Sequence, residues 1–291
     1  MPQLQFLRRF LCSAGGVNFF SIPLLLLILF LRNSAHADEE NSFRVCFLEN
    51  NLPYSSSKEK ENAGFDVDTA KAVAEALGKS LVPVWTKNST QIDEIEESDF
   101  PTRKLSRNEC DAIFSIPGQD AIKDSPKLAI GAPYYGAAFE LIGREQNVPH
   151  DLESLGNTPV AIQSQTIANF VLHARKVPIR TFFSTGEAVN GVVSGDATLA
   201  LLWGPAAGWH LRNHPDLKLF FIKGYEPPAV VRWNEHVATR KTDTKLREAI
   251  DKALVKINES GALQEFSQRY GMPFRQPFVS TYSLTEIQKL H

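Results

Sequence analysis

The sequence FRVCFLENNLPYSSSKEKENAGFDVDTAKAVAEALG, residues 43–78, decides the fold class of this chain. Its first eight residues are mostly apolar and predict a buried parallel strand. The polar stretch that follows contains Pro53 and Gly64 and predicts a loop. Apolar side chains then recur at helical spacing, with Asp66 at the start of the helix and Gly78 as its stop. This order indicates an α/β protein, in which ligands bind outside the carboxyl ends of the strands.

An export signal precedes this unit. Two arginines stand before an apolar stretch that is densest from Phe19 to Leu31, and Ala35-His36-Ala37 fits the small-x-small rule for cleavage. The stretch is short for a spanning helix, which needs about 20 residues, and Pro23 interrupts it. We therefore expect residues 1–37 to be a cleaved signal peptide and the protein to be periplasmic. An uncleaved membrane anchor is the alternative.

The rest of the chain is mildly acidic. Residues 1–37 hold three of the 31 basic residues and none of the 33 acidic ones, which leaves a formal charge of −5 after cleavage. This charge does not attract nucleic acid or an anionic membrane. We expect no nucleic-acid partner and no membrane span once the signal is removed.

Two cysteines remain after cleavage, Cys46 in the first predicted strand and Cys110 at the start of another, CDAIFSI. An even number of cysteines in an exported chain favours a disulfide. If the two strands are neighbours in a parallel sheet, the sulfurs can meet, and the crosslink would contribute about 4 kcal/mol. Two separate buried thiols are the alternative, and two cysteines alone are a weaker basis for a metal site.

The α/β pattern occurs twice along the chain. After strands near residues 81–85 and 110–116, residues 119–136 look irregular up to the apolar segment AAFELIG (137–143). TPVAIQ (158–163) then begins a second α/β unit. A chain that crosses at 137–143 and returns near 222–232 predicts a two-lobe clamshell, with mostly parallel sheets flanked by helices, two hinge crossings and a ligand cleft between the lobes.

The predicted organisation has four parts. They are the signal peptide (1–37), the first part of lobe 1 (38–140), lobe 2 (141–224), and a return crossing with C-terminal helices that pack on lobe 1 (225–291).

Most of the predicted mature chain resembles the type II periplasmic solute-binding proteins, extracellular solute-binding family 3. The segment 43–78 matches the family opening, PYYGAAFELIGRE (133–145) its first crossing, and the helical segment 245–271 its C-terminal helices. Within the family, the chain is most similar to the J-type accessory proteins of pyrroloquinoline-quinone-dependent methanol dehydrogenases. That likeness rests on RVC with NNLPYS and Cys110-Asp111, on WGPAAGWH (203–210), and on QRYGMPF (268–274).

The resemblance also indicates where a ligand would lie. Amino-acid-binding members hold the ligand carboxylate with an arginine before the PYY segment and the ammonium with an aspartate after a lobe 2 strand. Here the first position falls near Asp124 and the second holds Trp203, so both halves of this clamp look absent. We therefore expect an apolar or peptide-like ligand, such as a segment of another protein.

The candidate ligand-binding residues are aromatic, small or neutral and polar, and they lie near the predicted cleft. They are Asn50, Asn51, Tyr54, Phe65, Ser115, Tyr134, Tyr135, Ser164, Thr166, Trp203 and Gly204. For the aromatic residues, core packing is the alternative to ligand contact. His210 and His214 have a metal-compatible spacing, but no third ligand is evident, so we expect no metal and no cofactor.

These observations lead to three functional hypotheses. The first is a non-enzymatic periplasmic accessory factor that binds a quinoprotein alcohol dehydrogenase through the cleft. The second is a receptor that delivers a small polar, amino-acid-like solute to the permease of an ABC importer. The third is a lyase or dehydratase on the same clamshell, for which the sequence offers only weak acid or base candidates such as Glu49 and Asp66, and Asp66 is better explained as a helix-start residue.

Overall fold

The computed structural model describes residues 41–58, 63–87, 100–144, 149–283 and 286. The predicted signal peptide, residues 1–37, lies outside these residues. In the described part of the chain, no helix is both long and apolar enough to cross a membrane. The described residues from Phe43 onward belong to one structural unit, to which everything below refers.

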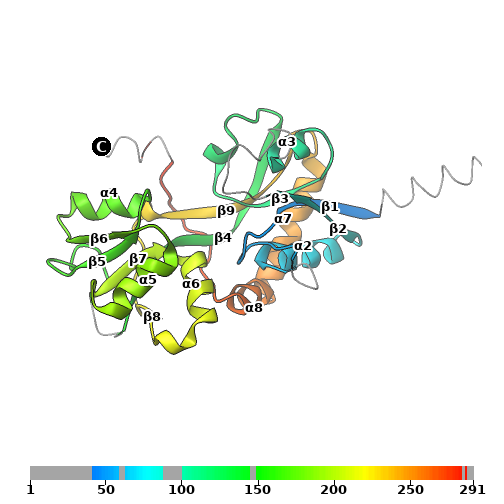
Figure 1. Cartoon of the computed structure of the whole chain (residues 1–291). Helices are drawn as coiled ribbons and strands as arrows, with labels where there is room; N and C mark the ends of the chain where they lie inside the picture. The colour runs from blue at the N-terminus through cyan, green and yellow to red at the C-terminus, as the bar shows by residue number, and fades with distance from the viewer. Residues whose placement is uncertain (1–40, 59–62, 88–99, 145–148, 284–285, 287–291) are drawn as a thin grey trace, which may run out of the picture. The chain divides into compact units, whose positions relative to one another are not determined.

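Strands and helices alternate along most of this unit (Figure 1). In chain order they are β1 (Ser42–Leu48), α2 (Phe65–Ala76), β2 (Ser80–Thr86), α3 (Pro101–Ser106), β3 (Ile113–Ile116), η3 (Gln119–Ile122), β4 (Leu128–Gly143), β5 (Val160–Gln163), α4 (Ile167–Ala174), β6 (Ile179–Phe182), α5 (Thr185–Ser194), β7 (Leu199–Trp203), α6 (Gly204–Asn213), η4 (Pro215–Leu217), β8 (Phe220–Phe221), η5 (Ala229–Val231), β9 (Arg232–Arg240), α7 (Thr244–Glu259) and α8 (Ala262–Arg269).

The first unit, β1, a loop and α2, confirms the prediction from residues 43–78. The loop returns to the start of α2, where the N–H groups of Phe65 and Asp66 donate to the carbonyl oxygens of Pro53 and Tyr54 at 2.8 and 2.9 Å. These bonds satisfy N–H groups that a helix start leaves without an intrahelical acceptor. Gly64 has a φ of 133°, and a Cβ there would collide with the backbone of Tyr54. Glycine therefore lets the loop pack against the helix.

The predicted disulfide between Cys46 and Cys110 is present, with Cα atoms 5.7 Å apart. The two chain segments are parallel neighbours, as expected, because Val45 and Ala112 form a parallel bridge. The N–H of Cys46 also donates to the carbonyl oxygen of Ala112 at 3.0 Å.

A mixed sheet of seven strands has the order β3-β9-β4-β7-β5-β6, with β8 beside β4, and β1 and β2 form a separate two-stranded sheet. Within the mixed sheet, β5 pairs in parallel with β6 and β7, whereas the pairs that involve β4 or β9 are antiparallel. Along β4, residues up to Ala138 pair with β9, and residues from Phe139 onward pair with β7. The chain therefore crosses between the two halves of the sheet within the predicted segment 137–143.

The prediction that residues 119–136 are irregular is wrong from Leu128 onward. β4 begins at Leu128 and continues without a break through PYYG, because its residues 128–138 pair with β9. Pro133 lies within this part of β4. It lies at a register irregularity of the pair, a position at which a strand tolerates proline.

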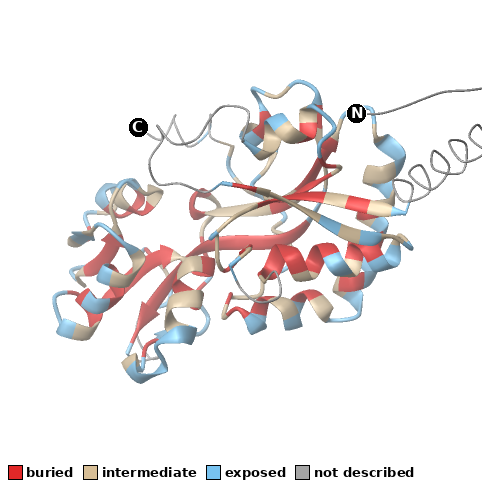
Figure 2. Cartoon of the chain, turned by 45° about the vertical axis from the view of Figure 1, so that its right-hand side comes forward, coloured by how far each residue is buried: buried red, intermediate tan, exposed pale blue. Residues whose placement is uncertain are grey.

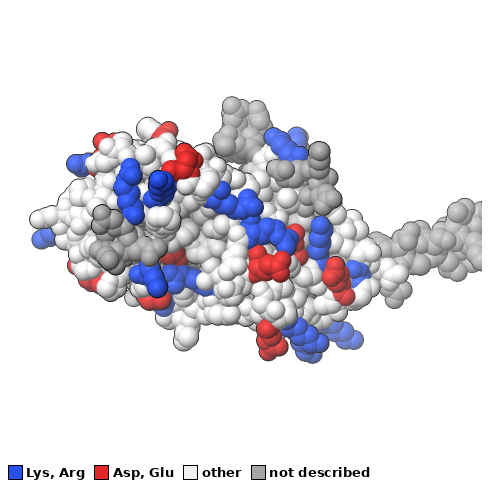
Figure 3. All heavy atoms as spheres, turned by 90° about the horizontal axis from the view of Figure 1, so that it is seen from below, with Lys and Arg blue, Asp and Glu red and all other residues white. Residues whose placement is uncertain are grey.

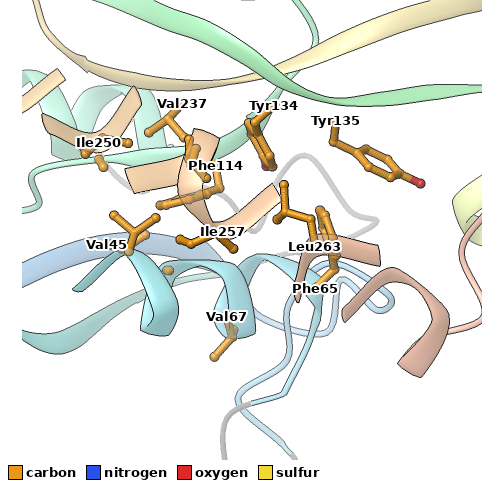
Figure 4. Close-up of a cluster of buried hydrophobic side chains, with 14 of the residues drawn as sticks. Val45, Phe65, Val67, Phe114, Tyr134, Tyr135, Val237, Ile250, Ile257 and Leu263 are labelled. Atoms are coloured by element: carbon orange, nitrogen blue, oxygen red, sulfur yellow. The ribbon is translucent and has the colours of Figure 1, made fainter. Parts of the chain in front are cut away.

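Two groups of hydrophobic clusters lie on either side of this crossing, which gives the clamshell its two lobes. One group joins β1, α2, β3, α7 and α8, and Figure 4 shows part of it, with Phe65, Phe114, Tyr134 and Leu263 among the labelled side chains. The other joins β5, β7, α4, α5 and α6. Figure 2 shows buried residues along the strands and exposed residues on the outer helices. The lobe boundaries at 140 and 224 remain predictions.

The C-terminal helices confirm the predicted break at Gly261, which has a φ of 82° between α7 and α8. Both helices pack against α2, and α7 also packs against β4. Beyond α8, Gly271 lies against Gly208 of α6, and a Cβ on either glycine would collide with the backbone oxygen of the other. The segments WGPAAGWH and QRYGMPF, which are far apart in the sequence, are therefore packed together.

Candidate ligand-binding cavity

A cavity of about 870 Å³ lies at the ends of β1 and β3, beside the first half of β9 and the last residue of β7. Its walls come from the loop after β1, the first turn of α2, the start of α3, the loop after β3, and residues of β7 and β9. The chain near Tyr282 covers another part of it. Aromatic side chains make up much of the lining: Phe47, Tyr54, Phe100, Phe114, Trp203, Trp233 and Tyr282.

Asp66 enters the cavity from the first turn of α2 and is only 7% exposed. Its Oδ1 accepts a hydrogen bond from Ser115 Oγ at 2.6 Å. The N–H of Ser115 donates to the hydroxyl of Tyr134 at 3.1 Å. Ser115 has a φ of 50°, so these contacts hold a non-glycine residue in the left-handed region. Burial raises the pKa of Asp66 to about 7, although the bond from Ser115 lowers it.

Glu235 enters the cavity from β9 and is 2% exposed. Its Oε2 is buried and has no hydrogen-bond partner among the described residues. Burial, with a further contribution from the carboxylate of Asp66, raises the pKa of Glu235 to about 8. A buried carboxyl oxygen without a partner is costly, and such groups often mark functional sites.

Trp203 and Trp233 form an aromatic wall beside these carboxyl groups. Trp203 ends β7, and Trp233 lies near the start of β9. Their ring centroids are 5.7 Å apart in an edge-to-face arrangement, and Phe139 packs against both rings at 5.6 and 6.3 Å. Tyr54 lines the cavity as well, and the pKa of its hydroxyl is raised first by burial and then by Glu235.

The structure brings together four of the predicted ligand-binding residues at the cavity wall: Asn51, Tyr54, Ser115 and Trp203. Tyr134 stands directly behind the wall, where its hydroxyl contacts Ser115. The disulfide residue Cys46 also reaches the cavity. These positions agree with a ligand role for the residues, which remains a prediction.

The other predicted residues lie outside the lining. Phe65 and Tyr135 are core residues with ring centroids 5.0 Å apart. The Tyr135 hydroxyl donates to the carbonyl oxygen of Pro273. Gly204 is buried at the start of α6, where a Cβ would collide with the side chain of Glu140 and the carbonyl oxygen of Ala138.

Three more predicted residues also lie away from the cavity. Asn50 adopts a φ of 51° in the turn after β1. In lobe 2, Ser164 donates its N–H to the carbonyl oxygen of Phe182, and Thr166 donates its hydroxyl to the carbonyl oxygen of Gln163 at 2.8 Å. These two polar groups of the loop before α4 therefore form hydrogen bonds to nearby backbone oxygens of the same lobe.

Two carboxyl groups of the cavity were missed as site residues. Asp66 was explained by its place at the helix start, where it does lie, but its carboxyl also faces the cavity. Glu235 occurs in the segment VVRWNEHVAT, and a carboxyl group inside a strand was the available signal. Trp233, on the same strand, was missed with it. A strand alternates its faces, but only its pairing decides which face meets the cavity.

The cavity lining differs in charge from the outer surface. Among the described lining residues, the carboxyl groups are those of Asp66, Asp120, Glu235 and Glu286, and none of these residues is lysine or arginine. On the face shown in Figure 3, by contrast, basic and acidic side chains are interspersed. The cavity therefore favours positively charged groups.

His210 and His214 stack with ring centroids 4.3 Å apart, outside the cavity. Nδ1 of His214 is 2.9 Å from the carbonyl oxygen of His210. Within the described residues, no group of three or more His, Cys, Asp or Glu side chains is arranged to hold a metal ion.

Comparison with known proteins identifies the family. The model of the bacterial extracellular solute-binding proteins, family 3, matches residues 43–273. A probable ABC transporter arginine-binding protein, ArtJ of Chlamydia trachomatis, is 28% identical over 221 residues, which cover 74% of this chain and 79% of that protein.

Two solved structures show the same fold. An ancestral cationic amino acid solute-binding protein has a TM-score of 0.62 at 22% identity, and the match covers 82% of this chain and 99% of the other. MxaJ of Methlophaga aminisulfidivorans has a TM-score of 0.57 at 20% identity, over 80% of this chain and all of the other. At these identities, the similarity establishes the fold of this chain alone.

Proposed function

Because the chain belongs to the bacterial extracellular solute-binding proteins of family 3, we propose that it is a periplasmic, non-enzymatic binding protein that holds its ligand in the cavity beside Trp203 and Trp233. The volume of about 870 Å³ is near the upper end of the range of roughly 300–1,000 Å³ for ligand pockets. The aromatic side chains offer large apolar contact surfaces, and the polar side chains of the lining can orient a ligand.

The role that we propose is that of an accessory factor for a quinoprotein alcohol dehydrogenase. The observation that carries it is the place of Trp203. It lines the cavity at the end of β7, where amino-acid-binding members of the family carry an aspartate for the ligand ammonium. A tryptophan there suits an apolar or peptide segment better than a free amino acid. The J-type signatures WGPAAGWH and QRYGMPF support the same role, and they pack together through Gly208 and Gly271.

Binding to a purified pyrroloquinoline-quinone-dependent methanol dehydrogenase tests this role directly. We expect the chain to bind the enzyme and W203L to bind at least tenfold more weakly. F220L is the matched control, because Phe220 is an exposed aromatic residue outside the cavity. If the wild-type chain does not bind the dehydrogenase, the accessory role is wrong.

A second candidate is a receptor that delivers a cationic solute to an ABC importer. Two observations favour it: the carboxyl groups of Asp66 and Glu235 in the cavity, and the similarity to the probable arginine-binding protein ArtJ. A thermal-shift screen of amino acids and amines separates the two candidates. Ligand at 100 times its dissociation constant would stabilise the protein by about 2.7 kcal/mol. A shift of that size with a free solute, without binding to the dehydrogenase, would favour the receptor.

A clamshell-derived lyase is the third hypothesis. Asp66, with a pKa raised to about 7, is the group that proton transfer would use. We propose binding rather than catalysis, because the matched family is one of solute-binding proteins.

A further inference from the structure

The carboxyl group of Glu235 is buried, and one of its oxygens has no hydrogen-bond or ionic partner among the described residues. It is 2% exposed and lines the cavity, and within the described part of the chain its Oε2 is buried without a hydrogen bond. A buried carboxylate needs hydrogen bonds or an opposite charge to offset the loss of its hydration. The cavity is therefore the side from which such a partner can reach it.

Asp66 provides a second carboxyl group at the same place. Its charge raises the pKa of Glu235, so the two groups interact. Ser115 occupies Oδ1 of Asp66 through the 2.6 Å hydrogen bond from its hydroxyl. The two residues come from different elements, α2 and β9, and the fold alone brings them to the same cavity.

The other groups that face Glu235 do not neutralise it. Tyr54 on the loop after β1 and Tyr134 and Tyr135 on β4 are near enough for its charge to raise the pKa of each hydroxyl, after the larger effect of burial. His236, the next residue on β9, has its Nδ1 at 2.8 Å from the carbonyl oxygen of Gly131, and burial lowers its pKa. No described residue that lines the cavity is a lysine or arginine, so we take the ligand as the source of a positive charge for this pair.

The surrounding aromatic rings define what kind of cation fits. Tyr54, Trp203 and Trp233 line the cavity beside the two carboxyl groups. Aromatic faces attract ammonium and guanidinium groups and cover the apolar carbons attached to them. A hard metal ion such as Ca²⁺ takes six or more oxygen ligands, which two carboxyl groups among aromatic rings do not provide.

We propose that Asp66 and Glu235 form a subsite for the ammonium or guanidinium group of the ligand, with Tyr54, Trp203 and Trp233 covering the carbon chain or ring that bears it. This inference rests on the proposed function and names the chemistry of its ligand. The cation comes from a lysine or arginine side chain of a partner segment or from a free organic amine.

Binding of a cation at this subsite should change the number of protons that the protein holds. Without ligand, Asp66 and Glu235 hold protons near neutral pH, because their pKa values are raised to about 7 and about 8. A bound cation favours the charged carboxylates. Binding at pH 7 therefore releases protons to the buffer.

Isothermal titration at pH 7 with two pairs of probes tests the proposal. The small pair is benzylamine and its neutral analogue benzyl alcohol. The peptide pair is a capped hexapeptide with one central arginine and the same peptide with citrulline in its place. We expect at least one charged probe to bind at least tenfold more tightly than its neutral partner. We also expect its binding enthalpy to vary with the ionisation enthalpy of the buffer, which reports the released protons.

Two isosteric variants, E235Q and D66N, locate the effect. Each is expected to weaken binding of the charged probe at least tenfold and to leave the neutral probe unchanged. The control is D216N, which removes the same charge at an exposed residue outside the cavity. If benzylamine binds more tightly than the arginine peptide, the cation comes from a free amine. If the peptide binds more tightly, the cation comes from a side chain of a partner protein.

Equal binding of the charged and neutral probes would overturn the cation subsite while leaving the cavity as a binding site. An E235Q variant that folds and binds benzylamine or the arginine peptide as tightly as the wild type would also overturn it. If none of the four probes binds, the subsite is overturned, and the proposed function stands when the dehydrogenase still binds. If the dehydrogenase does not bind either, the proposed function fails together with the subsite.

Discussion

The guanidinium group of Arg275 binds the carboxylate of Glu140 through two hydrogen bonds, with Nε 2.6 Å from Oε1 and Nη2 2.9 Å from Oε2. Glu140 lies on the crossing strand β4 and is 3% exposed, whereas Arg275 belongs to the segment after α8. Nη2 also donates to the carbonyl oxygen of Tyr225 at 2.9 Å. This ion pair holds the C-terminal segment against the crossing strand, beside the start of α6.

Removing the cation of this pair should be costly. R275M leaves the Glu140 carboxylate buried and unpaired, and the loss of one partner from a buried pair typically costs about 3–5 kcal/mol. Urea unfolding at pH 7 measures the change. The control is R175M, which removes an ion pair to the well-exposed Glu153 and should cost at most about 1 kcal/mol. Equal losses of unfolding free energy in the two variants would show that the buried ion pair stabilises the protein no more than the exposed one.

The disulfide should account for a substantial part of the stability. Cys46 and Cys110 are 64 residues apart, and closing a loop of that length restricts the unfolded chain by about 4 kcal/mol. We expect C46A/C110A to lower the free energy of unfolding by roughly that amount. Dithiothreitol should lower the Tm of the wild type and leave that of the double variant unchanged. A loss below about 1 kcal/mol would show that the crosslink barely restrains the unfolded chain.

The contact between Gly208 and Gly271 predicts the sign of the stability change when Gly208 is replaced by alanine. Within a helix, changing glycine to alanine normally stabilises by about 0.5–1 kcal/mol. G208A should instead destabilise the protein, because its Cβ would collide with the carbonyl oxygen of Gly271 and separate α6 from the C-terminal segment. Thermal unfolding followed by circular dichroism measures the difference. A Tm at or above that of the wild type would contradict the close packing of the two segments.

Ser115 combines a left-handed backbone with a hydrogen bond to Asp66. S115A and S115G both lose the hydrogen bond to Asp66. Glycine adopts a φ of 50° without strain, whereas the same backbone conformation destabilises the folded protein with alanine by about 1 kcal/mol. We therefore expect S115A to be less stable than S115G by that amount, although alanine keeps more of the side chain. Urea denaturation of the two variants side by side tests the order. The reverse order would mean that the backbone at this residue relaxes.

Stability of the ligand-free protein should fall as the pH rises. The folded protein holds protons on Asp66 and Glu235, whose pKa values are about 7 and about 8, at pH values where the unfolded chain has lost them. The stability that these protons contribute is fully present below about pH 4 and is lost as the pH rises through 7 and 8. The expected observation is a Tm that decreases between pH 5 and pH 9.

The E235Q variant isolates one of these groups. It should flatten the decrease of Tm and be more stable than the wild type at pH 9, by an amount on the order of a few kcal/mol, because its amide cannot ionise. D216N, with its exposed position, should keep the full dependence. A wild-type profile that is flat or rises from pH 5 to pH 9 would show that the two carboxyl groups ionise normally in the folded protein.

Sequence reasoning was most successful where one short segment carries the signal. The unit from Phe43 to Gly78, the break at Gly261 and the pairing of Cys46 with Cys110 could all be predicted, because periodicity, breakers and cysteine count act locally. The extent of β4 could not, since Pro133 looks like a breaker until its partner strand β9 is known. The predicted cleft residues near strand ends included Tyr54, Ser115 and Trp203, which do line the cavity.

By itself, the sequence determined the α/β class, the repetition of the pattern along the chain and the family, because these depend on apolar spacing and on ordered motifs. Only the tertiary structure decided that Asp66 and Glu235 face one cavity and that Gly208 meets Gly271. The physical reason is that burial and the approach of distant side chains are set by strand pairing and helix packing. In the sequence, a carboxyl group at a helix start gives the same pattern whether it is exposed to water or lines a cavity with aromatic side chains.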